Sequence, residues 1–202
     1  MTTLTRRTTL AAAISLPLAG TAIAAEPEGR FQFVEGDPNA KVTVVEYASL
    51  TCPHCGHFHR DIFPEIKKNF IDTGKVRWVM RHFPLDQLAM AASILTACAP
   101  NNNGRKLYDT LYANQDTWAP SQAPIEPLKE YAQVAGMTGD AVETCLRDKE
   151  LIDAFRAELN KNFETHNVEA TPAFFIGSED LQGAPEYAEF AEILNKHIAA
   201  AK

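Results

Sequence analysis

The residues best suited to chemistry are two cysteines, Cys52 and Cys55, separated by Pro53 and His54. Thiols at this spacing can close a disulfide and open it again by exchange with a thiol of another molecule. The motif therefore predicts a redox-active disulfide, which needs no bound cofactor.

The motif lies where a strand is expected to end and a helix to begin. Cys52 then faces the unpaired amides and the positive end of that helix, which stabilise a thiolate. His54 can add a donor or a positive charge to the same sulfur, and Pro53 restrains the turn. A lowered thiol pKa stabilises the reduced pair, so we expect the disulfide to act as an oxidant.

Two other uses of the motif stay open. A purely structural disulfide is one, although so short a loop would constrain the chain little. A metal or copper-handling site is the other, because His54, His57 and His59 crowd the two thiols. A structural zinc site would need a second pair of ligands, and the sequence shows none at a suitable spacing, so we expect no metal.

An acidic residue, Glu46, lies six positions before the motif inside an apolar strand. By alternation it shares a face with Val42 and Val44, which places it in the interior beneath the motif. Burial there would raise the pKa of the carboxyl group, which could then accept the proton of Cys55. A glutamate that is exposed at the sheet edge, or one that forms a salt bridge, is the alternative.

Hydrophobic patterning predicts the elements that position these residues. Strands are expected at 31–34, 41–48, 75–81, 173–176 and 181–183. A helix follows the motif, with apolar residues at Phe58, Ile62, Ile66 and Phe70, and ends near Gly74. The strands on either side of this helix should be parallel, joined by a right-handed crossover.

The middle of the chain has helical patterning only. Helices are expected at 88–99, 104–113, 125–135, 139–146 and 150–165, and a last helix begins at Pro185–Glu186. The interior face of this last helix should hold Tyr187, Phe190, Ile193, Leu194 and Ile198. We therefore predict an α/β fold made of residues 26–86 and 167–202, with residues 87–166 as an inserted helical subdomain.

The first 25 residues are typical of an export signal. Arg6 and Arg7 precede a short apolar stretch, and Ala22-Ile23-Ala24 is typical of a cleavage site. The route would be the twin-arginine or the general secretory one, and the mature chain would lie in the oxidising periplasm. The formal net charge of -7 is spread over the chain, which argues against a nucleic-acid partner.

Together, the CPHC motif after a strand, the helical stretch and Thr171-Pro172 before a late strand resemble the DsbA branch of the thioredoxin superfamily. The resemblance covers about residues 38 to 200. It implies a thioredoxin fold with a nucleophile at Cys52, a buried resolving thiol at Cys55 and a buried acid at Glu46. It also implies a cis peptide bond at Pro172, with Thr171 offering backbone hydrogen bonds to an extended substrate.

Members of this branch donate their disulfide to unfolded, reduced exported proteins and are reoxidised by a quinone-linked, DsbB-like membrane partner. The resemblance implies the same partners here. Thr171 departs from the valine common at this position and is also found in isomerases and reductases, so either direction of exchange stays open. Only about 15 residues separate the expected cleavage site from the first strong strand, too few for a dimerisation region, so we expect a monomer.

Cys98 and Cys145 remain if Cys52 pairs with Cys55. A structural disulfide between them would close a loop of about 48 residues and stabilise the fold by roughly 4 kcal/mol in the chain-entropy model. Two separate buried thiols are the alternative.

Overall fold

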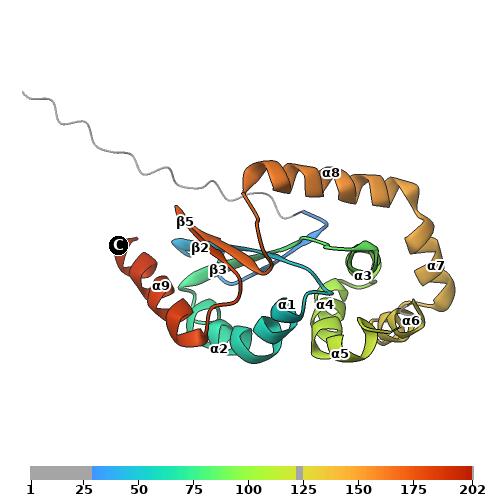
Figure 1. Cartoon of the computed structure of the whole chain (residues 1–202), viewed down its shortest axis with the longest axis horizontal. Helices are drawn as coiled ribbons and strands as arrows, with labels where there is room; N and C mark the ends of the chain where they lie inside the picture. The colour runs from blue at the N-terminus through green and yellow to red at the C-terminus, as the bar shows by residue number, and fades with distance from the viewer. Residues whose placement is uncertain (1–28, 122–124, 202) are drawn as a thin grey trace, which may run out of the picture.

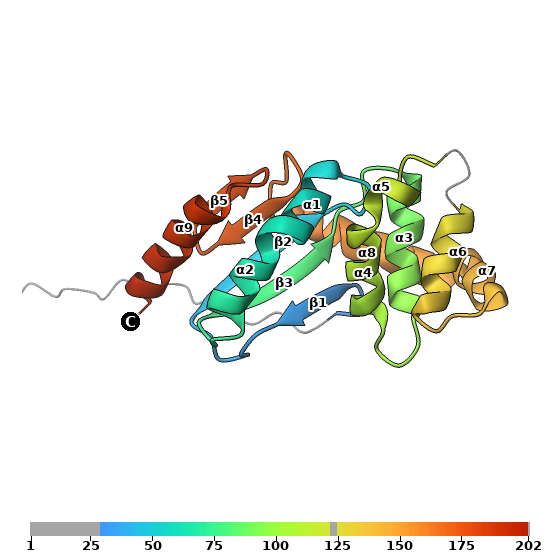
Figure 2. The same cartoon turned by 90° about the horizontal axis from the view of Figure 1, so that it is seen from below.

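The structure, a computed structural model, describes residues 29–121 and 125–201, and the expected export signal lies outside them. In the described residues, five strands form one sheet (Figure 1), and their order is β1-β3-β2-β4-β5 (Figure 2). They are β1 (Gln32–Glu35), β2 (Val42–Ala48), β3 (Val76–His82), β4 (Ala173–Ile176) and β5 (Glu179–Gln182). As predicted, β2 and β3 are parallel neighbours, whereas the other adjacent pairs are antiparallel.

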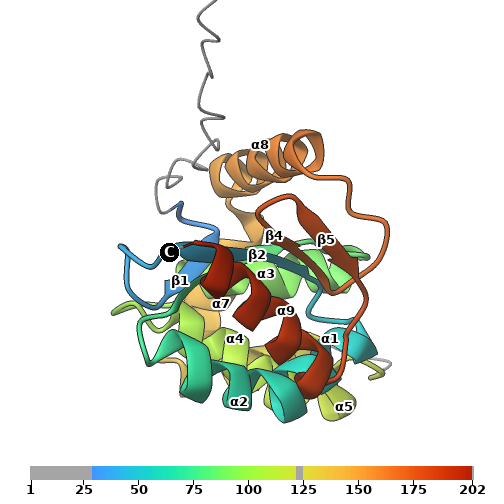
Figure 3. The ribbon, with the colours of Figure 1, turned by 90° about the vertical axis from the view of Figure 1, so that its left-hand side faces the viewer.

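One helical segment follows the cysteine motif. It consists of α1 (Pro53–His57), the π-helical turn η1 (Phe58–Ile62), α2 (Phe63–Ile66) and a second π-helical turn η2 (Lys67–Ile71). Its predicted apolar residues are all buried. The last helix, α9 (Tyr187–Ala200), lies beside it on the same face of the sheet (Figure 3).

In the described part of the chain, six helices lie between β3 and β4, and all of them except α5 were predicted from the patterning. They are α3 (Gln87–Cys98), α4 (Gly104–Ala113), α5 (Gln115–Trp118), α6 (Ile125–Val134), α7 (Gly139–Arg147) and α8 (Lys149–Thr165). Most of them stand beside the sheet (Figure 2), and α8 returns over the face opposite α2 and α9 (Figure 3). Within the described ranges, every helix is too short or too polar to cross a membrane.

Two elements differ from the prediction. The four-residue helix α5 was not predicted, because one turn is too short to show hydrophobic periodicity. Strand β5 begins at Glu179, two residues before the predicted start, because the turn is confined to Gly177 and Ser178. Gly177 has a φ of 62°, a left-handed conformation that glycine adopts without steric cost.

Aromatic side chains join the three layers beneath the cysteine motif. The ring of Phe58 lies 4.7 Å from that of Phe174 in β4, and Trp78 of β3 lies 5.6 Å from Phe190 of α9. All four side chains are fully buried, and each contributes roughly 1.5–3 kcal/mol through burial. This closely packed cluster supports the cysteine motif from below.

Candidate active site at the Cys52–Cys55 pair

Cys52 is the residue immediately before α1. Its backbone is extended, with φ -76° and ψ 120°, and Pro53 occupies the first helical turn, where the missing N–H costs nothing. Both cysteines are free thiols in the structure. The Cys52 residue is 6% exposed and Cys55 is not exposed at all, so Cys52 is the thiol that a partner can reach.

The surroundings lower the pKa of Cys52 from 9.0 to about 5. The largest cause is a hydrogen bond from the Cys55 thiol to the Cys52 sulfur, and the Thr171 side chain adds another. Backbone N–H groups of Cys55 and His54 donate as well, whereas burial works in the opposite direction. Cys52 is therefore a thiolate at neutral pH.

The pKa of Cys55 moves in the other direction, well above its usual value of 9.0. Burial is the main cause, and the negative charges of the Cys52 thiolate and of Glu46 add to it. One sulfur of the pair is thus stable as an anion and the other as a neutral thiol.

His54 reaches the Cys52 sulfur through its backbone. Its side chain is exposed, and the interaction that lowers the Cys52 pKa comes from the His54 N–H. The sequence interpretation assigned this effect to the imidazole. Any residue other than proline would supply the same N–H.

Thr171 and Pro172 lie against the catalytic sulfur. The peptide bond between them is cis, and the Cys52 sulfur lies 3.2 Å from the Thr171 carbonyl oxygen, to which it donates only when it is a protonated thiol. Both residues are buried, and the N–H of Gly183 donates to the Pro172 carbonyl at 2.7 Å. The structure thus brings this loop, about 120 positions away in the chain, to the motif.

Glu46 is completely buried and has two partners. Its Oε1 lies 2.7 Å from Nε2 of His59, and its Oε2 accepts a hydrogen bond of 2.8 Å from Nε1 of Trp78. It is therefore not an exposed edge residue, but it is paired with a histidine, as the salt-bridged alternative required. The sequence suggests His59 only as a possible metal ligand. In the structure it pairs with Glu46, and its ring stacks on that of Tyr112 with the two centroids 4.2 Å apart.

A second functional residue that the sequence interpretation missed is Gln115 of α5. Its Nε2 donates to the carbonyl oxygens of Leu50 and Cys52 at 2.8 and 2.9 Å, and its side chain is buried. A Cβ atom on Gly56 would overlap Gln115 Oε1, so any larger residue at position 56 would displace the Gln115 amide. No sequence signal marked Gln115, because the contact joins the helical insertion to a turn more than 60 residues earlier.

The remaining histidine of the motif region, His57, pairs with Asp61 on the surface at 2.8 Å. In the part of the chain that the structure covers, residues 29–121 and 125–201, no group of three or more histidine, cysteine, aspartate or glutamate side chains is arranged to hold a metal ion.

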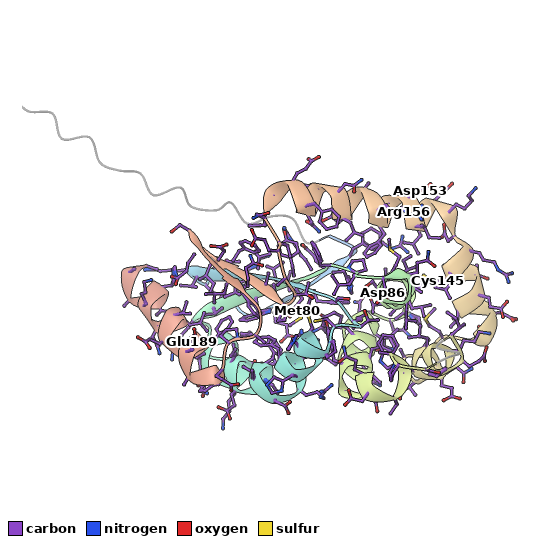
Figure 4. The ribbon with its side chains drawn as sticks, viewed as in Figure 1. Met80, Asp86, Cys145, Asp153, Arg156 and Glu189 are labelled. Atoms are coloured by element: carbon purple, nitrogen blue, oxygen red, sulfur yellow. A yellow bond between two sulfur atoms is a disulfide. The ribbon has the colours of Figure 1, made fainter. Side chains whose placement is uncertain are left out.

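Cys98 and Cys145 are joined by a disulfide in the structure. Cys98 is the last residue of α3 and Cys145 lies in α7, with their Cα atoms 6.3 Å apart (Figure 4, where Cys145 is labelled). The bridge therefore fastens two helices of the insertion to each other, away from the Cys52–Cys55 pair.

Comparison with known proteins places this geometry in a family. Residues 30–196 match a family model described as Thioredoxin. The crystal structure of alpha-DsbA1 from Wolbachia pipientis is 30% identical, with a TM-score of 0.75 over 84% of this chain and 92% of that one. Disulfide bond formation protein D of Bacillus subtilis is 29% identical over 192 residues, which are 88% of this chain and 82% of that protein.

A protein from Rickettsia bellii named "Putative protein-disulfide oxidoreductase" is 36% identical over 144 residues, or 71% of this chain. The match covers 56% of the Rickettsia protein, so this chain spans about half the length of that relative. The match to the family model and the likeness to alpha-DsbA1 extend across the sheet, the cysteine motif and the helical insertion. The chain therefore belongs to the thioredoxin family, as a DsbA-like member.

Proposed function

We propose that this chain is a protein thiol:disulfide oxidoreductase that works as a dithiol oxidase, donating the Cys52–Cys55 disulfide to reduced exported proteins. The observation that carries the proposal is the opposite direction of the two thiol pKa shifts. Because the Cys52 thiolate is stable, the reduced pair is favoured and its disulfide is a strong oxidant.

The exchange proceeds in two steps. A client thiolate attacks the Cys52 sulfur, a client–Cys52 disulfide forms, and the Cys55 sulfur leaves and takes up a proton because its pKa is high. A second client thiolate then attacks the client sulfur of this mixed disulfide. The client disulfide closes, Cys52 leaves as a thiolate, and the client has lost two electrons to the enzyme.

The surrounding residues have supporting roles in this proposal. Glu46 exchanges the proton of Cys55, whose pKa its negative charge helps to raise. Thr171 and cis-Pro172 receive the extended client chain beside the Cys52 sulfur, which lies 3.2 Å from the Thr171 carbonyl oxygen. The Cys98–Cys145 disulfide has a structural role, and the division at residues 86/87 and 166/167 separates the redox fold from its insertion.

Location and partners follow from kinship with DsbA-like proteins. We propose export to the periplasm with removal of residues 1–25, action as a monomer, and reoxidation by a quinone-linked membrane partner of the DsbB type. Clients are reduced exported proteins rather than nucleic acids.

The deciding experiment equilibrates the purified protein with glutathione buffers and follows the Cys52–Cys55 pair. We expect a potential near that of strongly oxidising members of the superfamily, about -120 mV. A potential as reducing as that of thioredoxin, about -270 mV, would favour the reductase or isomerase alternative. Retention of one metal ion per chain, lost in Cys52→Ala, would favour the metal-handling alternative.

A further inference from the structure

A cleft of about 470 Å³ opens beside the catalytic turn, on the side of the helical insertion. Its lining includes Thr51 and Pro53, the two chain neighbours of Cys52. It also includes Leu88 of α3 and Ala119, just after α5. A client whose cysteine has reached Cys52 therefore passes next to this cleft.

Two carboxylates line the cleft. Asp86 is held at the start of α3, where it accepts hydrogen bonds of 2.7 Å from the Thr51 hydroxyl and from the backbone N–H of Ala89 (Figure 4, where Asp86 is labelled). The Asp116 side chain is 84% exposed, and Nη2 of Arg60 lies 3.9 Å from it, outside the cleft lining. No lysine, arginine or histidine is among the residues that line this cleft in the described part of the chain.

The rest of the lining is largely apolar. Pro53, Leu88, Ala119 and Pro120 offer hydrocarbon surface in the same cleft as the two carboxylates. A long side chain with an aliphatic stem and a cationic end matches both features, because lysine and arginine bury their methylene groups while the charge stays at the polar rim. An aliphatic client residue would form no ion pair with the carboxylates, and an acidic one would be repelled by them.

We propose that this cleft binds a lysine or arginine side chain of the client next to its reacting cysteine, and so makes the enzyme select cysteines that have a basic neighbour. The inference rests on the proposed function and adds the class of client segment to it. The occupant is an extended segment of a reduced protein, held by charge complementarity and by contact of its aliphatic stem with the cleft.

The test uses three reduced two-cysteine peptides that differ at the position next to the first cysteine, which holds lysine, norleucine or glutamate. Each peptide is made in two versions, with the variable residue directly before or directly after the first cysteine. Both versions are needed because a client chain running in either direction would place one neighbour of its cysteine at the cleft. The second-order rate constant for oxidation by the full-length disulfide form is measured by stopped-flow mixing. We expect the lysine peptide to react about tenfold faster than the glutamate peptide, in the range typical of electrostatically complementary interfaces.

The variants Asp116→Asn and Asp86→Asn remove the charges. Asparagine at position 86 still caps α3, so the helix start is preserved. The ratio of the lysine to the glutamate rate should fall to about threefold in Asp116→Asn and to near one in the double variant, and 0.5 M salt should lower it in the wild type.

The matched control is Asp61→Asn, which removes an exposed carboxylate of η1 that lies outside the cleft. It should keep the tenfold ratio. Equal rates for the lysine and glutamate peptides in the wild type, or the same ratio in the double variant as in Asp61→Asn, would overturn the cleft assignment while leaving oxidase activity intact. Failure to oxidise any of the peptides would overturn the proposed function itself.

Discussion

Oε1 of Glu46 and Nε2 of His59 lie 2.7 Å apart beneath the cysteine motif, and both side chains are almost completely buried. A buried pair of this kind is costly to break, because the remaining group keeps its desolvation without its partner. The pair links β2 to the helical segment that carries the two thiols. It is therefore expected to matter both for stability and for the position of the acid that serves Cys55.

Replacement of His59 by leucine should lower the free energy of unfolding by about 3 kcal/mol, because Glu46 loses its partner in the interior. Adding Glu46→Leu should restore part of this loss. The measurement is urea unfolding at pH 7. The control is His57→Leu, which breaks an exposed pair with Asp61 and should cost no more than about 1 kcal/mol. Equal losses in the two single variants would contradict this view of the pair.

The reduced protein should show a thiolate absorbance near 240 nm that appears with a midpoint near pH 5, from the pKa of Cys52. Because the folded pKa lies below the unfolded value, the stability that this group contributes is fully present above the unfolded pKa, near 9. It is lost as the pH falls through about 5. The contribution is the difference in unfolding free energy between the reduced wild type and reduced Cys52→Ala, measured across this pH range. A difference that does not change with pH would contradict the prediction.

Gln115→Leu should lower the free energy of unfolding by about 2 kcal/mol, because the carbonyls of Leu50 and Cys52 both lose a donor. The exposed Gln133→Leu is the matched control and should change stability by less than about 0.5 kcal/mol. Hydrogen exchange of the Cys52 turn should also be faster in Gln115→Leu. An unchanged exchange rate there would argue against a role for Gln115 in holding the turn.

His82 should make the fold sensitive to acid. Burial lowers its pKa to about 3, so the folded protein keeps it neutral while the unfolded chain is protonated below about pH 6.5. Stability is thus present above pH 6.5 and lost as the pH falls toward 3. Between pH 7 and pH 4.5, the wild type should lose about 2–3 kcal/mol more than His82→Gln in urea unfolding. Equal losses of unfolding free energy in the two proteins would exclude His82 as the origin of the acid sensitivity.

Opening the Cys98–Cys145 disulfide by the double change to alanine should cost up to about 4 kcal/mol, since the unfolded chain regains the freedom of a long loop. The midpoint of urea unfolding of the oxidised protein is the measurement. A double variant as stable as the wild type would mean that the bridge constrains the unfolded state little.

The sequence by itself determined the parts that local pattern specifies. Alternation and β-branching in 41–48 predicted β2, the spacing from Phe58 to Phe70 predicted the helical segment, and their order around CPHC predicted the parallel pair β2 and β3. Each of these depends on residues within one element or its immediate neighbour, so hydrophobic periodicity and the handedness of the crossover connection are sufficient to predict them.

Only the tertiary structure decided which distant side chains meet the motif. It paired Glu46 with His59 rather than leaving His59 beside the thiols, and it directed the Gln115 amide of a one-turn helix at the carbonyl of Cys52. It also brought the Thr171 carbonyl to the Cys52 sulfur. These contacts depend on how the layers and the helical insertion pack in three dimensions, and side-chain spacing along the chain carries no information about that packing.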